Sequence, residues 1–260
     1  MGFREKLEQG NFVKILETVP PKGINLEKIF ANLKNFKNKI DATTVVDSPL
    51  GIARMHPLPV AEKIQRELNI ETVMHFICRD RNKIEIEAEL LAASAVGIKN
   101  ILALTGDPAK DGKAVFELNS IGLIDFIQKF NERHETDFFV GAGLNINADL
   151  ETEMKRANRK IEAGAKFFIT QPCFDAEKIK QWKKLKVPII TGILVVSDKK
   201  IFDYFSKVPG IKIPERLAGL VDDEEKIIDY YKKLIDDLEK VVAGVCLMPI
   251  GNYEIVKKII

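Results

Sequence analysis

The sequence is poor in cysteine, in net charge and in long apolar runs, and each shortage excludes a class of protein. Its three cysteines, Cys78, Cys173 and Cys246, are widely spaced and include no Cys-x-x-Cys pair. This sparse, odd set argues against a disulfide framework and fits a reducing cytoplasm. No metal-ligand spacing joins the cysteines to the three histidines, so we expect no structural zinc site.

The charges nearly balance, with 40 Lys and Arg against 38 Asp and Glu. This balance lacks the basic excess that is typical of proteins binding nucleic acid. No apolar run approaches the ~20 residues that a membrane span needs. The N-terminal Met-Gly-Phe-Arg-Glu-Lys also lacks the apolar region of a signal peptide. We therefore expect a cytoplasmic protein with no membrane or nucleic-acid partner.

What the sequence does contain is a regular alternation of short apolar runs and longer amphipathic segments. The apolar runs predict strands at 12–16, 42–46, 72–77, 101–104, 138–142, 167–170, 188–196 and 244–248. Eight strand–helix units with short links predict an α/β fold, a single (β/α)8 TIM barrel over residues 1–260. An open doubly wound sheet is the main alternative, because periodicity does not reveal whether a sheet closes.

Polar side chains stand in or directly after several of these strands. They are Glu17, Asp47, His75, Asp107, Gln171 and Ser197. The carboxyl ends of the strands carry the active site in (β/α)8 barrels, so the sequence predicts a site there. The fold alone does not indicate its chemistry.

The most informative strand end is Ile-Leu-Ala-Leu-Thr-Gly-Asp-Pro, residues 101–108. Four apolar residues in a row suit a strand buried on both faces. Gly106 lets the backbone turn or a ligand approach, and Pro108 prevents the strand from continuing. The Asp107 carboxylate is therefore expected just beyond the strand. Ordinary turn chemistry is the alternative interpretation of Gly-Asp-Pro.

Glu17 is the best candidate for catalysis. It follows an apolar strand and precedes the rigid Pro20-Pro21 pair. A carboxyl group partly buried beside an aromatic ligand has a raised pKa and can donate a proton near neutral pH. A salt bridge between Glu17 and Lys22 is the alternative.

Three motifs, in this order, resemble the methylenetetrahydrofolate reductase family. They are Glu-Thr-Val-Pro-Pro-Lys at 17–22, Gly-Asp-Pro at 106–108, and Thr170-Gln171 followed by Phe174 and Asp175. The resemblance covers most of the chain and is greatest to short single-domain bacterial and archaeal forms. It implies a TIM-barrel flavoprotein of one-carbon metabolism, an oxidoreductase acting on CH–NH groups. Such an enzyme reduces 5,10-methylenetetrahydrofolate, or a related tetrahydropterin, to the 5-methyl form.

The resemblance also implies roles for individual residues. Glu17 would be the general acid that assists opening of the imidazolidine ring to an iminium ion, which takes a hydride from reduced flavin. Asp107 would stabilise cationic folate intermediates, and Gln171 would hydrogen-bond the folate. Phe174 could stack on the pterin or the nicotinamide. The alternatives are a satisfied polar strand end for Gln171 and a core position for Phe174.

The cofactor implied by the resemblance is FAD, with FMN as the alternative. The residues at matching cofactor positions are His75, Thr105, Gly106, Asp107, Ser120, Arg159 and Lys160. Left to ordinary structural roles, His75 would be a core histidine, Ser120 a helix cap, and Arg159 and Lys160 solvated charges.

The sequence departs from the family pattern around the flavin. The family has Arg where Thr105 stands, and a Tyr-containing loop where residues 144–148 stand. We therefore expect flavin to bind more weakly than in larger relatives.

The electron donor implied by the resemblance is NAD(P)H or an iron–sulfur partner protein, and the chain could form a homo-oligomer. A different class of function is a non-catalytic barrel subunit that docks an iron–sulfur partner. Retention of Glu17, Asp107 and Gln171 favours the enzyme. A Schiff-base aldolase or lyase is a third possibility, but Lys14 sits too early in its strand.

Overall fold

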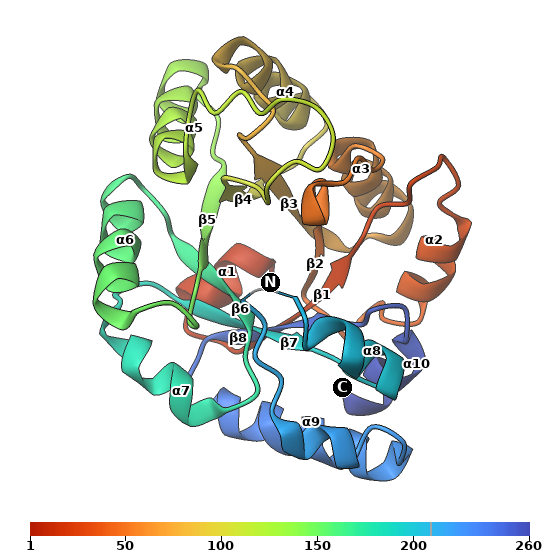
Figure 1. Cartoon of the computed structure of the whole chain (residues 1–260). Helices are drawn as coiled ribbons and strands as arrows, with labels where there is room; N and C mark the ends of the chain where they lie inside the picture. Colours follow the sequence, from red (N-terminus) through yellow and green to blue (C-terminus); the bar gives the residue numbers. More distant parts are fainter. Residues whose placement is uncertain (209) are drawn as a thin grey trace.

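Eight parallel strands close into a barrel in the order in which they occur in the sequence, and helices surround them (Figure 1). This computed structural model describes residues 1–208 and 210–260. The strands are β1 (Val13–Thr18), β2 (Ala42–Val45), β3 (Glu71–Ile77), β4 (Asn100–Leu104), β5 (Phe139–Leu144), β6 (Phe167–Pro172), β7 (Ile189–Leu194) and β8 (Gly244–Met248). Because β1 pairs with β8 as well as with β2, the predicted barrel is confirmed and the open sheet is excluded.

Except for α2, which follows Leu26, the helices of the outer layer begin after a capping side chain. They are α2 (Glu27–Lys34), α3 (Pro57–Leu68), α4 (Lys83–Ala95), α5 (Ser120–His134), α6 (Leu150–Glu162), α7 (Ala176–Lys180), α8 (Lys199–Phe205), α9 (Glu224–Glu239) and α10 (Tyr253–Ile259). Short 3-10 turns η1 (Pro49–Gly51), η2 (Gln181–Lys184) and η3 (Glu215–Gly219) lie between them. Asn82, Asn119, Asp149 and Asp223 each accept a first-turn backbone N–H at the start of α4, α5, α6 and α9. These caps satisfy N–H groups that have no partner inside the helix.

Two apolar cores follow from the two-residue period of the strands. One core lies between the barrel and the helices. The other fills the barrel and consists of Phe3, Leu7, Val13, Ile15, Ala42, Val73, Leu102, Phe139, Phe167, Ile169, Ile190 and Cys246. Along β1, the side chains that point into the barrel are Val13, Ile15 and Glu17. Val13 and Ile15 fill the lower barrel, and the Glu17 carboxylate therefore points into its upper end.

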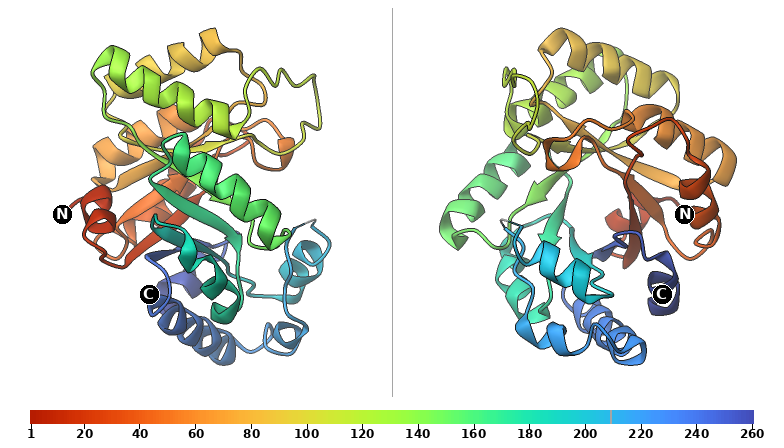
Figure 2. Two further views of the ribbon diagram at one scale, coloured as in Figure 1. Left: turned by 90° about the vertical axis from the view of Figure 1, so that its left-hand side faces the viewer. Right: turned by 45° about the vertical axis from the view of Figure 1, so that its right-hand side comes forward.

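A short helix, α1 (Phe3–Glu8), closes the lower end of the barrel and had not been predicted from the sequence. Figure 2 shows α1 at one end and the long β4–α5 connection at the other. The Phe3 ring meets the Phe167 ring edge-on at 5.5 Å and the Phe139 ring at 6.4 Å. A Cβ on Gly141 would overlap the Phe167 ring, so glycine there makes room for it. Aromatic packing therefore fills the lower barrel.

The strand ends differ from the prediction in a way that matters for the site. β1 continues to Thr18 and β6 to Pro172, so Glu17 and Gln171 lie inside strands. Their backbones are held by the sheet, which restricts both side chains more than a loop would.

Among the described residues, no helix combines the length and the apolar content needed to cross a bilayer.

Phe3→Ala is expected to lower the free energy of unfolding by about 3–5 kcal/mol, because it empties the space between two rings. Phe3 is only 1% exposed. Gln9→Ala, at an exposed position just after α1, is the matched control and should change stability by less than ~0.5 kcal/mol. Urea unfolding measures both. A Phe3→Ala loss as small as that of the control would mean that α1 does not support the barrel.

Candidate active site

A cavity of about 760 Å³ opens at the carboxyl ends of the strands. Its volume lies within the range of small-molecule sites. The inward side chains at its base are Glu17, His75, Leu102, Ile169, Gln171 and Cys246. Two walls rise above them: the β4–α5 connection with the start of α5, and the β5–α6 connection with α6. Most of the polar strand ends predicted from the sequence therefore meet in one place.

Glu17 is held beside Thr44 by the pairing of β1 with β2. It makes no hydrogen bond or ion pair with any residue that the structure describes, and Lys22 is exposed to solvent. The predicted alternative, a salt bridge between the two, is thus not formed. Burial without a compensating partner raises the pKa of Glu17 to about 7. The carboxyl group can therefore be either protonated or ionised near neutral pH.

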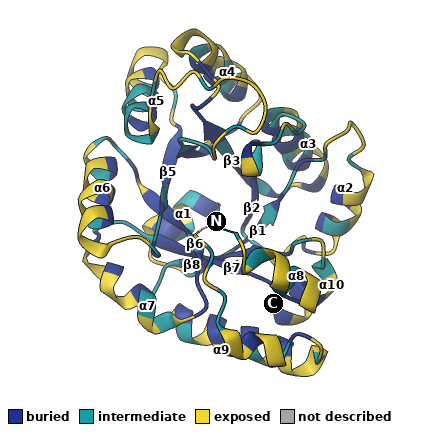
Figure 3. Ribbon diagram, in the orientation of Figure 1, coloured by how far each residue is buried: buried dark blue, intermediate teal, exposed yellow. Residues whose placement is uncertain are grey.

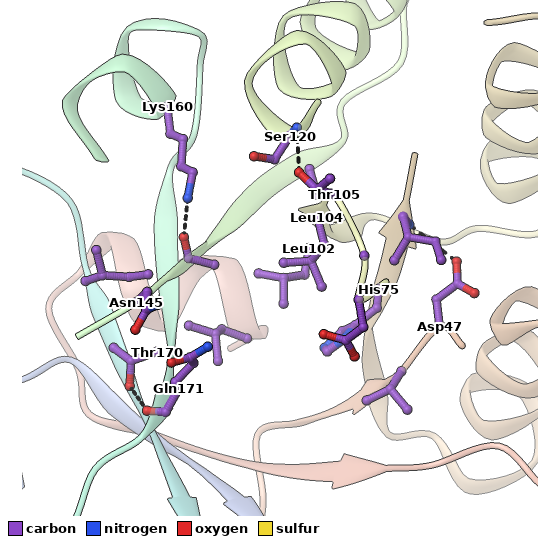
Figure 4. Close-up of a pocket in the computed structure, with 18 of the residues that line it drawn as sticks. Asp47, His75, Leu102, Leu104, Thr105, Ser120, Asn145, Lys160, Thr170 and Gln171 are labelled. Carbon is purple, nitrogen blue, oxygen red and sulfur yellow. Dashed lines mark hydrogen bonds between the residues drawn. The ribbon is translucent and has the colours of Figure 1, made fainter. Parts of the chain in front are cut away.

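His75 and Gln171 also face the cavity, from β3 and β6 (Figure 4). The Nε2 atom of His75 and the Oε1 atom of Gln171 are buried and have no hydrogen-bond partner among the described residues. Burial lowers the pKa of His75 to about 4, so the imidazole is neutral at physiological pH. Both side chains line the cavity, so these two atoms are available to bind a ligand there.

The Thr105-Gly106 turn connects β4 to the cavity wall. The Thr105 hydroxyl oxygen accepts a hydrogen bond from the Ser120 backbone N–H at 3.1 Å. Asn119, rather than Ser120, caps α5 by accepting from the Gly122 N–H at 3.0 Å. Gly106 has φ +99°, a conformation that favours glycine. These contacts leave the first turn of α5 at the cavity, with Asn119 and Ser120 among its lining residues.

Asp107 lies at the rim of the cavity and is exposed. Its Oδ2 atom accepts a hydrogen bond from the Leu50 N–H at 2.7 Å, and the Lys110 N–H donates to the Gly51 carbonyl at 3.0 Å. Leu50 (φ 58°) and Gly51 (φ 68°) both have left-handed backbone conformations. The β2–α3 and β4–α5 connections are therefore joined through the Asp107 side chain and one backbone contact.

The adjacent wall is formed by α6. Arg156 and Arg159 are exposed and line the cavity, whereas Lys160 is buried. The Lys160 Nζ atom donates to the Gly143 carbonyl at 2.7 Å and lies 3.8 Å from a Glu153 carboxylate oxygen. Burial lowers the pKa of Lys160. Lys160 thus secures the end of β5. Arg156 pairs with the buried Glu153 carboxylate at 3.4 Å, whereas Arg159 makes no ion pair with any described residue and presents its charge to the cavity.

Arg156 was missed by sequence reasoning although its position carried a signal. Residues 153, 156 and 160 are three and four residues apart, so they share one face of a helix. Once Lys160 was placed near the cofactor, Arg156 could have been placed there as well. Asn145 was missed for a different reason: it lies in a loop, where its backbone N–H donates to Glu153 at 3.1 Å and its Oδ1 atom accepts from the Asn147 N–H at 3.0 Å.

Phe174 does not line this cavity. Its side chain is 4% exposed and belongs to the core between barrel and helices. Its carbonyl accepts a hydrogen bond from the Tyr230 hydroxyl at 3.0 Å. Phe174 therefore occupies the core position that the sequence analysis gave as the alternative to stacking on a ligand. The chain turns outward after Pro172, so the ring lies away from the barrel axis.

Asp47 faces the cavity but is engaged by the protein. Its Oδ2 atom accepts a hydrogen bond from Arg81 at 2.8 Å, and both side chains are buried. Arg81 in turn pairs with Glu89 at 2.9 Å. The Arg79 guanidinium donates to the Asp107 carbonyl oxygen. These arginines hold the strand ends from below the rim.

The site can hold an elongated ligand with an anionic end. Unpaired polar atoms occupy its base, and the first turn of α5 and the Arg159 guanidinium group offer positive potential on two adjacent walls. Among the described residues, no group of three or more His, Cys, Asp or Glu side chains is placed to hold a metal ion.

The sequence model of the family described as Methylenetetrahydrofolate reductase matches residues 2–259. The chain belongs to this family. The resemblance noted in the three motifs is thereby confirmed.

Named relatives differ in how much of their length the chain spans. Methylenetetrahydrofolate reductase 1 of Schizosaccharomyces pombe is 26% identical over 247 residues, which are 84% of this chain and 40% of that protein. The 5,10-methylenetetrahydrofolate reductase of Salmonella typhimurium is 27% identical over 254 residues, 90% of this chain and 83% of that protein. The chain thus spans about two fifths of the fission-yeast relative and most of the bacterial one.

A solved structure supports the fold independently. A protein from Clostridium thermocellum, described as uncharacterised and as binding two copies of 5-methyl-5,6,7,8-tetrahydrofolic acid, superposes with a TM-score of 0.72. The match covers 98% of this chain and 96% of that one at 18% identity. At this identity the likeness shows a shared fold.

Gly51→Ala is expected to destabilise the protein more than an ordinary left-handed glycine would. A Cβ at Gly51 would overlap the Pro108 carbonyl oxygen, whereas a Cβ at Gly10 (φ +74°) would meet nothing within 4 Å. Gly10→Ala should therefore lower the free energy of unfolding by only ~1–2 kcal/mol, because alanine disfavours the left-handed backbone conformation. Gly51→Ala should lower it further, because the added Cβ must also displace the turn that contains Asp107. Equal losses in urea unfolding would show that the two connections are not tightly joined.

Proposed function

We propose that this chain reduces 5,10-methylenetetrahydrofolate, or a closely related tetrahydropterin, to its 5-methyl form by hydride transfer from a reduced flavin. The observation that carries the proposal is Glu17: an inward carboxyl group without a protein partner, whose pKa lies near 7. Membership of the reductase family supports the substrate class, and the folate named for the Clostridium thermocellum structure agrees with it.

Glu17 acts on the substrate as a proton donor. Its protonated carboxyl group gives a proton to the N10 nitrogen while the bond from N10 to the bridging carbon breaks. The bridging carbon is left as an iminium on N5, and hydride addition converts it to the methyl group. A group that must donate a proton near pH 7 works best with a pKa close to that value, which burial in the barrel supplies.

The unpaired amide of Gln171 holds the pterin. A primary amide both donates and accepts hydrogen bonds, and a pterin edge presents both kinds of group. Gln171 projects from the strand that lies diagonally across the barrel base from His75 (Figure 4). The unpaired Nε2 atom of His75 on β3 and the unpaired Oε1 atom of Gln171 on β6 could thus each bind a different ring system in one cavity.

A flavin fits the residues on the other side of the site. His75, the Thr105-Gly106 turn and Ser120 would hold its ring and ribityl chain, and Arg159 with Arg156 and the first turn of α5 would hold its phosphate end. When bound and reduced, the flavin supplies the hydride. FAD is the first expectation and FMN the alternative. Lys160 has a supporting role, since its ammonium group is already used within the protein.

Asp107 acts electrostatically from the rim. An anionic carboxylate there favours cationic substrate species over anionic ones. Its hydrogen bond to the Leu50 N–H holds the carboxylate in place without removing its charge. The non-catalytic subunit is the weaker proposal, because it gives no reason for an unpaired carboxyl group at the base of the cavity.

The test compares the wild-type protein with Glu17→Gln after reconstitution with FAD and, separately, FMN. Chemically reduced flavin removes dependence on the physiological electron donor. Stopped-flow oxidation of this flavin by methylenetetrahydrofolate should be fast in the wild type and slower by ~10²-fold or more in Glu17→Gln, which cannot donate the proton. Glu62→Gln, on α3 and not among the residues that line the cavity, is the matched control and should behave as the wild type.

A second measurement shows whether Glu17→Gln acts by removing the proton donor or by unfolding the protein. Because the pKa of Glu17 is higher in the folded chain than its ordinary value of 4.5, the free energy of unfolding should fall as pH rises from about 4.5 through about 7. At pH 8, Glu17→Gln should therefore have a higher free energy of unfolding than the wild type, by on the order of 3 kcal/mol, as measured by urea unfolding. Unchanged flavin oxidation by folate in a stable Glu17→Gln variant would remove Glu17 from the mechanism. Failure of the wild type to bind either flavin would reject the proposed function.

A further inference from the structure

Thr44, on β2, carries a buried hydroxyl group that the folded chain leaves without a partner. All four residues of β2 are buried, and Thr44 is 0% exposed (Figure 3). Its Oγ1 atom makes no hydrogen bond of normal geometry with any residue that the structure describes. Burying a hydroxyl group without a partner is unfavourable, so Thr44 is a candidate for a role in function rather than in stability.

The position of Thr44 in the sheet places its hydroxyl group beside the proposed proton donor. Ala42 packs inside the barrel, and side chains alternate along a strand, so Thr44 also points inward. The in-register partner of Thr44 on β1 is Glu17. Neighbouring strands lie about 4.8 Å apart, so the hydroxyl group and the carboxyl group project side by side into the barrel.

The other titratable groups around the base of the cavity are neutral near pH 7. His75, on β3, is neutral above its pKa of about 4. Burial, and then the Glu17 charge, raise the pKa of Cys246 well above its ordinary value, whereas Thr44 lowers it. Burial, and then the Glu17 charge, also raise the pKa of Tyr253 to about 12. Cys246 thus lies close to both Thr44 and Glu17, and none of these neighbours is a cation.

The charged side chains other than Glu17 line the rim and the walls of the cavity. Asp107 is exposed at the rim, and Asp47 pairs with Arg81. The charged residues of α6 form one wall: Glu153, Arg156, Arg159 and Lys160. Burial is the cause of the raised pKa of Glu17, so these charges leave its carboxyl group without an ionic partner.

We propose that Thr44 is a positioning residue whose hydroxyl group donates a hydrogen bond to the Glu17 carboxylate once the carboxyl proton has left. This inference rests on the proposed function. When Glu17 protonates N10, its O–H bond breaks, an N–H bond forms on the substrate, and a negative charge stays on the carboxylate. The unpaired Thr44 hydroxyl group turns toward that charge, because a hydrogen bond to an ionised group is stronger than one to a neutral group.

The Thr44 hydroxyl group assists proton transfer because its contribution changes during the step. Beside the protonated carboxyl group it gains little, and beside the carboxylate it donates a charge-assisted hydrogen bond. Interactions that are stronger in the transition state than in the ground state increase the rate. Thr44 acts through Glu17 and does not touch the substrate, so it affects the rate of the step and not the binding of folate.

The test is the titration of the Glu17 carboxyl group, followed by carbon-13 NMR, in Thr44→Val and Thr44→Ser. Valine keeps the shape of threonine and removes the donor, so Thr44→Val should raise the pKa of Glu17 by about 1 pH unit relative to the wild type. Thr44→Ser keeps a hydroxyl group and should titrate as the wild type does. Thr44→Ala also lacks the donor and replaces Thr44→Val if valine prevents folding.

Thr191→Val is the matched control for the loss of a buried hydroxyl group. Thr191, on β7, is also 0% exposed and has an unpaired Oγ1 atom. It shares a strand face with Ile189 and Ile193, which pack between the barrel and the helices. The hydroxyl group of Thr191 therefore lies outside the barrel, and Thr191→Val should leave the titration of Glu17 unchanged.

Single-turnover oxidation of reduced flavin by methylenetetrahydrofolate gives a second result. Thr44→Val should lower the maximal rate by up to ~10-fold and leave the folate concentration at half-maximal rate unchanged. The pH at which the rate falls by half should rise by about 1 unit, since the weaker acid stays protonated to higher pH.

Urea unfolding shows whether the variants are stable, and removing an unpaired hydroxyl group should not lower the free energy of unfolding. An unchanged titration of Glu17 in folded Thr44→Val would overturn the proposal. So would an equal rise in Thr191→Val. The titration requires neither flavin nor folate, so a failure of the proposed function and a failure of this inference are separate results.

Discussion

The site depends on one geometric constraint: in a closed barrel of parallel strands, every second side chain must enter a confined space. At the lower end that space is filled by Phe3, Phe139 and Phe167, with Gly141 making room. The space above this aromatic layer is lined by the next inward-pointing side chain of each strand. On β1, β3 and β6 the next inward residues are Glu17, His75 and Gln171. The packed base thus determines which side chains meet a ligand.

The same confinement explains the electrostatics. Glu17 and His75 are half-buried above an apolar layer, so the charged form of each is disfavoured. Burial raises the pKa of Glu17 and lowers that of His75, which leaves both groups mainly neutral just below pH 7. Positive charge is kept on the walls, at Arg156 and Arg159. A neutral proton donor at the base and cationic groups near the mouth suit a ring system with an anionic tail.

The barrel and most of the cavity residues were predictable because they depend on local patterns. Apolar runs marked the strands, and polar residues at their ends marked the site. Helix α1 was not predictable in this way, since its six residues gain stability from rings at positions 139 and 167, far away in sequence. The hydrogen bond between Asp107 and Leu50 is equally long-range. Phe174 shows a different limit: an aromatic residue after a strand can turn toward the barrel axis or away from it, and periodicity does not distinguish the two.

The central claim is that the barrel holds a carboxyl group still protonated near neutral pH. Carbon-13 NMR of protein labelled at the glutamate carboxyl carbons tests it directly, with Glu17→Gln to assign the resonance. The account predicts one resonance that titrates near pH 7 and is missing from the variant. If the Glu17 resonance instead titrates near 4.5, with the other glutamates, the carboxyl group is ionised at neutral pH and the proposed proton donor is contradicted.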